Sequence, residues 1–176
     1  MTTMMPGETV IPGETVIHSE TVIHSETLTQ GSIHSQTLPQ REPLSTLAGK
    51  NILLVDGDAR VLEDLSNSLT RQGYCVTTAR DGAAGLRKAT CQPTNLAIID
   101  AHLPDADGMQ ICAQLTEEPQ TCGIPVIVLS DQGGPCIVRQ ARAAGSSYFL
   151  RKPFDPNVLL ALVEKSLHVR HELWLS

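Results

Sequence analysis

The sequence predicts an α/β domain built on a doubly wound, five-stranded parallel sheet. From residue 49 onward, short apolar segments alternate with amphipathic segments of helical period, which is the pattern of repeated strand–helix units. Residues 51–55, 96–100 and 125–130 are almost wholly apolar, as the central strands of a sheet covered on both faces are. Gly and Pro residues mark the junctions between the segments.

The first two strand–helix units occupy the region from residue 51 to residue 90. A strand over 51–55 precedes a helix over 60–71, in which the apolar residues recur on one face. Gly73 ends this helix, because glycine readily adopts the left-handed conformation that follows many helices. A mixed strand over 74–79 then leads to a second helix over 81–90.

The next units repeat this arrangement with more apolar strands. A third strand over 96–100 precedes a helix over 109–115, and a fourth strand over 125–130 precedes a helix over 136–144. Gly145 ends the fourth helix in the way that Gly73 ends the first. Both strands are apolar throughout most of their length, which places them inside the sheet.

A short mixed strand over 148–150 and a helix that begins at Pro156 complete the domain. Proline is well tolerated in the first turn of a helix. The buried side of this helix is expected to carry Val158, Leu159, Leu162, Val163 and Leu167. The second and fifth strands are the least apolar and therefore suit the edges, which favours the flavodoxin-like strand order 2-1-3-4-5.

Residues 1–48 form a separate region, and the domain spans residues 49–173. Residues 6–29 repeat with a period of six as PGETVI, PGETVI, HSETVI and HSETLT, and a linker rich in proline follows. The Val-Ile pairs offer too little apolar surface to offset the entropy of ordering, so we expect a disordered tail. The alternatives are a small β-solenoid, a strand that adds to a partner's sheet edge, or, less in keeping with the spacing, a metal site at His18, His24 and His34.

Composition narrows the class of protein. Apolar residues make up 41% of the chain and aromatic residues 3%, so the core must consist mainly of Leu, Ile, Val and Ala. The formal net charge of -6 disfavours direct binding to nucleic acid or to an anionic membrane surface. No apolar run approaches the roughly 18 residues of a membrane span, and the N-terminus does not read as a signal peptide. We expect a cytoplasmic protein whose five widely spaced cysteines are buried free thiols.

Reactive side chains occur where four of the predicted strands end. Asp56, Asp100, Ser130 and Lys152 each lie at or just beyond the end of an apolar strand. In an open parallel sheet the carboxyl ends of the strands share one edge, and ligands bind there. The sequence therefore predicts a functional site at this edge with Asp100 near its centre.

The segments ILLVDGD, IIDAHLPDADG, VIVLS and YFLRKPF, in this order and spacing, resemble the receiver domain of response regulators in two-component signalling, as in CheY-like proteins. The resemblance covers roughly residues 49–172. It implies that Asp100 accepts a phosphoryl group from a histidine kinase or phosphotransfer protein. It further implies that Lys152 and Ser130 contact the phosphoryl group and that Phe149 is the switch aromatic.

The resemblance also implies a Mg²⁺ site. Asp56 and Asp100 would supply carboxylates, His102 would supply its backbone carbonyl, and these hard oxygen ligands suit Mg²⁺. The family usually has a second acidic residue where this chain has Gly57. Asp58 is expected to compensate as a ligand, because Gly57 leaves the loop free to bend. Asp58 also suits the N-cap of the first helix, and if its carboxylate fails to reach the metal, the Mg²⁺ site would be weak.

Two further positions depart from the family. Asp131 follows Ser130 where a small residue is usual, and its charge would repel an incoming phosphoryl group. Phe149 lacks the hydroxyl group of the more common tyrosine. These departures bear on how readily the site is phosphorylated and on how the switch responds.

The leading hypothesis is a single-domain response regulator that is a phospho-acceptor rather than an enzyme and that signals by docking to a downstream protein. The alternative is a pseudo-receiver that binds proteins independently of phosphorylation. A flavin-binding protein of the same fold is a weaker third hypothesis, since no phosphate-binding loop follows the first strand. The family's docking face would include Arg139, Arg142, Arg151 and Trp174, and a homodimer through that face is a further hypothesis.

Overall fold

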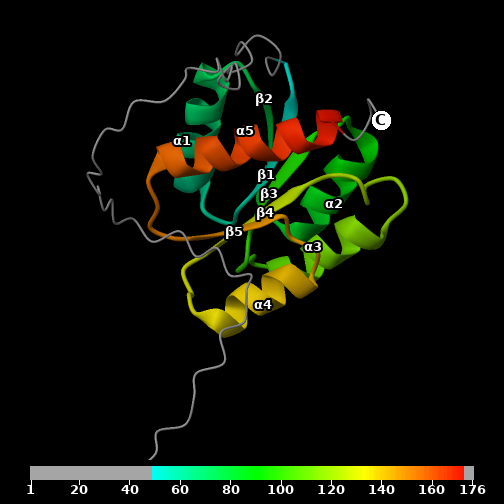
Figure 1. Cartoon of the computed structure of the whole chain (residues 1–176), viewed down its shortest axis with the longest axis vertical. Coiled ribbons are helices and arrows are strands. Elements are labelled where there is room, and N and C mark those ends of the chain that lie inside the picture. The colour runs from blue at the N-terminus through cyan, green and yellow to red at the C-terminus, as the bar shows by residue number, and fades with distance from the viewer. Residues whose placement is uncertain (1–48, 173–176) are drawn as a thin grey trace, which may run out of the picture. The chain divides into compact units, whose positions relative to one another are not determined.

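The computed structural model describes residues 49–172. The hexapeptide tail over 1–48, its alternatives and Trp174 lie outside the described residues. Five strands and five helices alternate along the described chain (Figure 1). The strands are β1 (Asn51–Val55), β2 (Cys75–Ala79), β3 (Leu96–Asp100), β4 (Val126–Ser130) and β5 (Tyr148–Arg151). The helices are α1 (Ala59–Arg71), α2 (Gly82–Cys91), α3 (Gly108–Glu117), α4 (Pro135–Ala143) and α5 (Pro156–Glu172).

The strands form one parallel sheet in the order β2-β1-β3-β4-β5, which confirms the predicted fold class and strand order. The mixed strands β2 and β5 lie at the two edges. The fully buried strands β3 and β4 lie inside the sheet, where neighbours cover both of their hydrogen-bonding sides.

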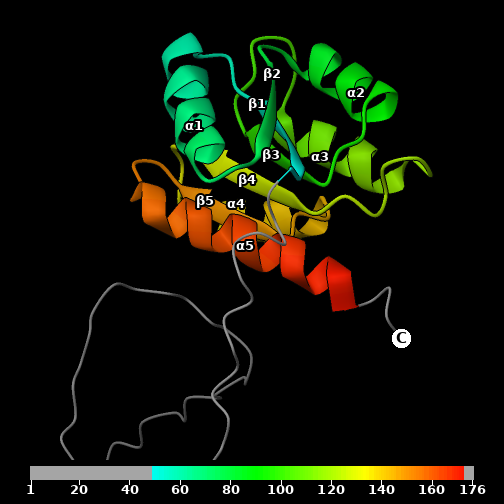
Figure 2. The ribbon, with the colours of Figure 1, turned by 90° about the horizontal axis from the view of Figure 1, so that it is seen from above.

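Two apolar clusters cover the two faces of the sheet. Ile52 and Leu54 of β1 pack with buried residues of α1 and α5, whereas Leu53 and Val55 pack with buried residues of α2, α3 and α4. This division follows from the alternation of side chains along a strand. Figure 2 shows the resulting layers, with α1 and α5 on one side of the sheet and α2 and α3 on the other.

The helix ends agree closely with the sequence signals. The carboxylate of Asp58 accepts a hydrogen bond from the backbone N–H of Arg60 at 2.8 Å, which caps α1. Asp81 caps α2 rather than forming its first residue. Gly73 has a φ of 88°, a conformation that glycine adopts without steric cost, and it follows the end of α1 as expected.

Two expectations about burial are wrong. Val158 is 47% exposed, because the apolar residues that α5 turns fully into the core are Leu159, Val163 and Leu167. All five cysteines are free, but Cys112 alone among them is buried. Burial raises the pKa of the Cys112 thiol to about 11. The other four are exposed and lie at strand or helix ends or on turns. The spacing of cysteines along the sequence carries no information about their exposure.

None of the helices in residues 49–172 combines the length and the apolar character that a bilayer-spanning helix requires.

Candidate functional site

The four predicted strand-end residues meet at one edge of the sheet. Asp100 and Ser130 are the last residues of the neighbouring strands β3 and β4. Asp56 directly follows β1, which pairs with the other side of β3, and Lys152 directly follows β5, which pairs with β4. The parallel register thus brings together side chains that are up to 96 positions apart in the sequence.

Lys152 joins the two carboxylates. Its Nζ atom lies 2.8 Å from Oδ2 of Asp56 and 3.1 Å from Oδ2 of Asp100. Asp56 is 1% exposed and Asp100 is 8% exposed, so one ammonium group faces two largely buried acids. The three side chains carry a net charge of -1 when all are ionised, which leaves the site attractive to a further cation.

The pKa values reflect this arrangement. Burial raises the pKa of Asp100, and the charge of Asp56 raises it further, although Lys152 opposes both effects. Burial would lower the pKa of Lys152, but its hydrogen bonds to the two carboxylates and their charges raise it. Lys152 is therefore held in its charged form, and ionised Asp100 is destabilised relative to an exposed aspartate.

Backbone N–H groups donate hydrogen bonds to the polar side chains of the site. The N–H of Asp58 donates to Oδ1 of Asp56 at 2.9 Å, and the N–H of His102 donates to Oδ1 of Asp100 at 3.4 Å. The N–H of Gln132 donates to Oγ of Ser130 at 3.1 Å. These contacts hold the side chains at the sheet edge in defined orientations.

Two glycines permit the loops to approach the site closely. A Cβ atom on Gly108 would lie 2.0 Å from the backbone oxygen of Asp100, so α3 begins directly against the end of β3. A Cβ atom on Gly57 would lie 3.1 Å from Cδ of Pro104, so the loop after β1 touches the segment after β3. The sequence signalled both as turn residues but not the contacts that require them.

The other predicted residues lie around this cluster. Asp58 turns its carboxylate to the start of α1, as the capping alternative predicted. Asp131 is exposed, and Phe149 is partly buried against the apolar cluster shared by α2, α3 and α4. The peptide bond between Lys152 and Pro153 is cis.

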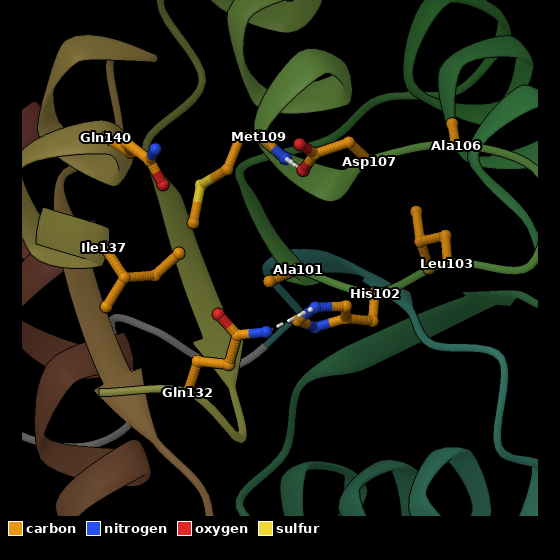
Figure 3. Close-up of a pocket in the computed structure, with 9 residues that line it drawn as sticks. All are labelled: Ala101, His102, Leu103, Ala106, Asp107, Met109, Gln132, Ile137 and Gln140. Atoms are coloured by element: carbon orange, nitrogen blue, oxygen red, sulfur yellow. Dashed lines mark hydrogen bonds between the residues drawn. The ribbon is translucent and has the colours of Figure 1, made fainter. Parts of the chain in front are cut away.

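A cavity of about 330 Å³ lies beside the cluster, between the segment after β3, the start of α3 and α4. Figure 3 shows His102 and Gln132 facing each other across its mouth, where Nε2 of His102 lies 3.3 Å from Nε2 of Gln132. The sequence predicted only a backbone role for His102. The side-chain contact went unpredicted because it joins two loops that only the fold brings together.

The carboxylates at this edge suit Mg²⁺, but the chain has one fewer than is usual in the family, because Gly57 stands where a second acidic residue is common. Asp56 and Asp100 offer buried carboxylate oxygens next to each other, and their charge exceeds that of Lys152. Among residues 49–172, no group of three or more His, Cys, Asp or Glu side chains is arranged to hold a metal ion. Mg²⁺ retains several waters in proteins, so two neighbouring carboxylates are compatible with it as ligands.

The sequence pattern of the response regulator receiver domain matches residues 52–164, which is more than half of the chain. The chain belongs to this family. Receiver domains are the phosphoryl-accepting modules of two-component systems, they interact with histidine kinases or phosphotransfer proteins, and they generally bind Mg²⁺ at the phosphorylation site.

Individual relatives agree with this assignment. The chain is 36% identical over 117 residues to the transcriptional regulatory protein GlrR of Escherichia coli, matching 66% of this chain and 26% of the relative. It is 32% identical to PhoP of Bacillus subtilis, matching 67% of this chain and 48% of the relative. The chain thus spans about half or less of the length of these curated relatives.

Solved structures show the same fold. A CheY-like receiver domain protein from Methanospirillum hungatei superposes with a TM-score of 0.67 at 26% identity, covering 71% of this chain and 98% of that one. The chemotaxis response regulator CheY4 of Vibrio cholerae gives a TM-score of 0.65 at 28% identity, covering 68% and 100%. The beryllofluoride-activated DrrB receiver domain gives a TM-score of 0.61 at 30% identity, covering 68% and 98%.

Proposed function

We propose that this receiver domain accepts a phosphoryl group on Asp100 and signals by docking to another protein. The observation that carries the proposal is the contact of Lys152 with both Asp100 and Asp56 at the sheet edge. A lysine between two acids provides a cation at the point where a phosphoryl group on Asp100 would bring additional negative charge. The backbone N–H groups of Asp58, His102 and Gln132 donate hydrogen bonds to the polar side chains at this edge.

The proposed reaction is a single phosphoryl transfer. An oxygen of the Asp100 carboxylate attacks the phosphorus of a phosphohistidine, a new O–P bond forms, and the N–P bond to the imidazole breaks. The imidazole nitrogen retains the electron pair and takes up a proton from solvent. In this proposal Lys152 stabilises the transferred charge and the Ser130 hydroxyl donates to a phosphoryl oxygen. The domain then acts as a phospho-acceptor rather than a turnover enzyme.

We propose that Asp56, Asp100 and the backbone carbonyl of His102 hold Mg²⁺, with Asp58 as the remaining predicted ligand. When bound, the ion neutralises charge on the transferring phosphoryl group. Asp58 engages the N–H of Arg60 instead of the cluster, which supports a weak site. The carboxylates themselves orient the acceptor oxygen and, with Lys152, set the charge of the site.

Gly57→Asp is expected to raise the affinity for Mg²⁺ by about tenfold, because affinity for hard cations rises with the number of carboxylates in reach. Pro104 must shift by a few tenths of an ångström to admit the new Cβ atom. Isothermal titration with Mg²⁺ measures the change. The control is Gly57→Asn, which makes the same demand on Pro104 without the charge. Equal affinities for the two variants would refute the role assigned to charge at residue 57.

The function is tested by incubating the full chain with acetyl phosphate and Mg²⁺ and following the intact mass. We expect a gain of one phosphoryl group that survives acid, is lost in base, and falls sharply when the metal is chelated. An unchanged mass at millimolar Mg²⁺ would contradict the proposal.

The pseudo-receiver is the second candidate, and the capping role of Asp58 is the observation that favours it. If the two carboxylates hold no metal, the domain acts by protein binding alone. Titration with Mg²⁺ and beryllofluoride separates the candidates. No response at millimolar concentrations would favour the pseudo-receiver, whereas a saturable response favours phosphorylation-dependent signalling.

We propose that the downstream protein docks on the surface of α4, β5 and α5. Arg139, Arg142 and Arg151 are exposed there and supply positive charge on a chain with a net charge of -6, so an acidic partner surface is favoured. A homodimer through the same surface is the related proposal. Sedimentation with beryllofluoride and Mg²⁺ tests it, and an unchanged sedimentation coefficient would count against dimerisation.

We also propose a cytoplasmic location. The free cysteines of the described region fit a reducing compartment. The second argument is that the domain must share a compartment with the histidine kinases or phosphotransfer proteins with which receiver domains interact.

A further inference from the structure

Two carboxylates from different parts of the chain meet at the start of α2. Asp81 precedes the helix, and its Oδ1 accepts a hydrogen bond from the N–H of Ala84 at 2.6 Å. Asp105 lies in the segment after β3, and its two oxygens accept from the N–H groups of Gly82 at 2.7 Å and Ala83 at 3.0 Å. Together they satisfy three N–H groups that have no partner within the helix.

The contact of Asp105 with α2 is directional. Because each oxygen of Asp105 takes one of two successive N–H groups, the carboxylate is fixed in both position and orientation. The hydrogen bonds from Gly82 and Ala83 lower the pKa of Asp105, so its charge persists well below neutral pH. A Cβ atom on Gly82 would lie 2.7 Å from Cδ1 of Ile111, so α2 also starts close against α3.

The segment that carries Asp105 also touches the phosphorylation site. At its beginning, the N–H of His102 donates to Oδ1 of Asp100. In its middle, Pro104 lies against Gly57, next to Asp56. At its end, Asp107 pairs with His102 through a β-bridge and caps α3. Asp105 therefore attaches the segment between Asp100 and α3 to the start of α2 through two hydrogen bonds.

We propose that Asp105 is a positioning residue for the phosphorylation site, which clamps the segment after β3 to the start of α2 and thereby fixes the His102 backbone against Asp100. The inference rests on the proposed function and extends it to a residue outside the acceptor, phosphoryl-contact and metal-ligand set. Asp105 itself does not touch the phosphoryl group. It acts through the backbone of His102, which supplies an N–H to Asp100 and is the proposed carbonyl ligand of Mg²⁺.

The experiment compares Asp105→Ala with Asp81→Ala. Each variant removes a carboxylate from the same helix end, but Asp81 belongs to the loop before α2 and has no hydrogen bond to the segment after β3. We expect Asp105→Ala to slow phosphorylation by acetyl phosphate about tenfold at subsaturating Mg²⁺ and to weaken Mg²⁺ binding by a similar factor. Asp81→Ala is expected to change both quantities by less than about twofold.

Asp105→Asn provides a graded variant, because its single side-chain oxygen retains one of the two hydrogen bonds. We expect it to fall between wild type and Asp105→Ala. Equal losses in Asp105→Ala and Asp81→Ala would show that the carboxylate only stabilises α2 and would overturn the proposal. Unchanged Mg²⁺ binding and phosphorylation in Asp105→Ala would overturn it as well.

A spectroscopic measurement separates this proposal from the proposed function. In amide NMR spectra without metal, Asp105→Ala is expected to shift the His102 resonance, whereas Asp81→Ala leaves it in place. An unmoved His102 resonance in Asp105→Ala contradicts the clamp even if the wild-type domain is phosphorylated. A shifted resonance in a domain that acetyl phosphate does not modify supports the clamp and instead contradicts the proposed function.

Discussion

Asp100→Asn is expected to reduce phosphorylation by acetyl phosphate to below about one hundredth of the wild-type level. The amide oxygen of asparagine is a far weaker nucleophile than a carboxylate and would not form an acyl phosphate. Lys152 would retain Asp56 as a partner at 2.8 Å, so the variant keeps a paired cation at the sheet edge. Intact-mass measurement before and after incubation gives the result directly.

The same variant is expected to be more stable than wild type at neutral pH in the absence of Mg²⁺. The folded-state pKa of Asp100 lies above its ordinary value, so ionisation of Asp100 opposes folding. This loss of stability appears as the pH rises from the unfolded-state pKa to the raised folded-state pKa and is complete once the pH exceeds the folded-state pKa. The stability difference should therefore shrink in acid, and urea unfolding at both pH values measures it.

Asp56→Asn is the matched control for the loss of phosphorylation. It also removes one negative charge next to Lys152 but leaves the carboxylate of Asp100 as acceptor. Phosphorylation should therefore be weaker than in wild type but still detectable at high Mg²⁺. A phosphoryl adduct of normal yield in Asp100→Asn would show that another residue is the acceptor.

Lys152→Ala is expected to have the second large effect. It leaves Asp56 and Asp100 buried without the cation that pairs with both, and removing one partner of a buried ion pair costs several kcal/mol. Because the Lys152 side chain retains 16% exposure, we expect a smaller loss of about 2–3 kcal/mol in the free energy of unfolding. Phosphorylation should also fall, since Lys152 is the cation that contacts the acceptor Asp100. Urea unfolding without metal measures the stability.

Added Mg²⁺ and a double variant provide two further tests of this prediction. Millimolar Mg²⁺ should restore part of the lost stability, because a cation that binds the folded state stabilises it by mass action. Combining Lys152→Ala with Asp100→Asn should restore part of it without metal, because only one of the two buried acids then remains. An unfolding midpoint in Lys152→Ala equal to that of wild type would contradict the assigned role of the ion pair.

The sequence predicted the fold and the convergence of the strand ends because both follow from periodicity. Apolar strands such as residues 96–100 can only lie inside a covered sheet, and parallel strands share one edge for their carboxyl ends. Asp56, Asp100 and Lys152 could therefore be placed together from the strand pattern alone. The structure adds their ionic contacts, at 2.8 and 3.1 Å.

Contacts between loops lay beyond the sequence pattern. The bond of Asp105 to Gly82 joins residues 23 positions apart, and the contact of His102 with Gln132 joins residues 30 apart. Neither pair shares an element or a periodicity, so only the packed sheet brings them together. The role of Asp58 was ambiguous because a carboxylate at this position suits both a helix cap and a metal ligand. In the structure it accepts from the nearby N–H of Arg60 and caps α1.

The central claim is that Asp100 is the residue that carries the phosphoryl group. Borohydride reduces an aspartyl phosphate to homoserine, which survives digestion and is located by peptide mass spectrometry. After treatment with acetyl phosphate and Mg²⁺, we predict homoserine at residue 100 and unmodified aspartate at residues 56 and 58. Homoserine at either of those two residues, or at none of the three, would contradict the account.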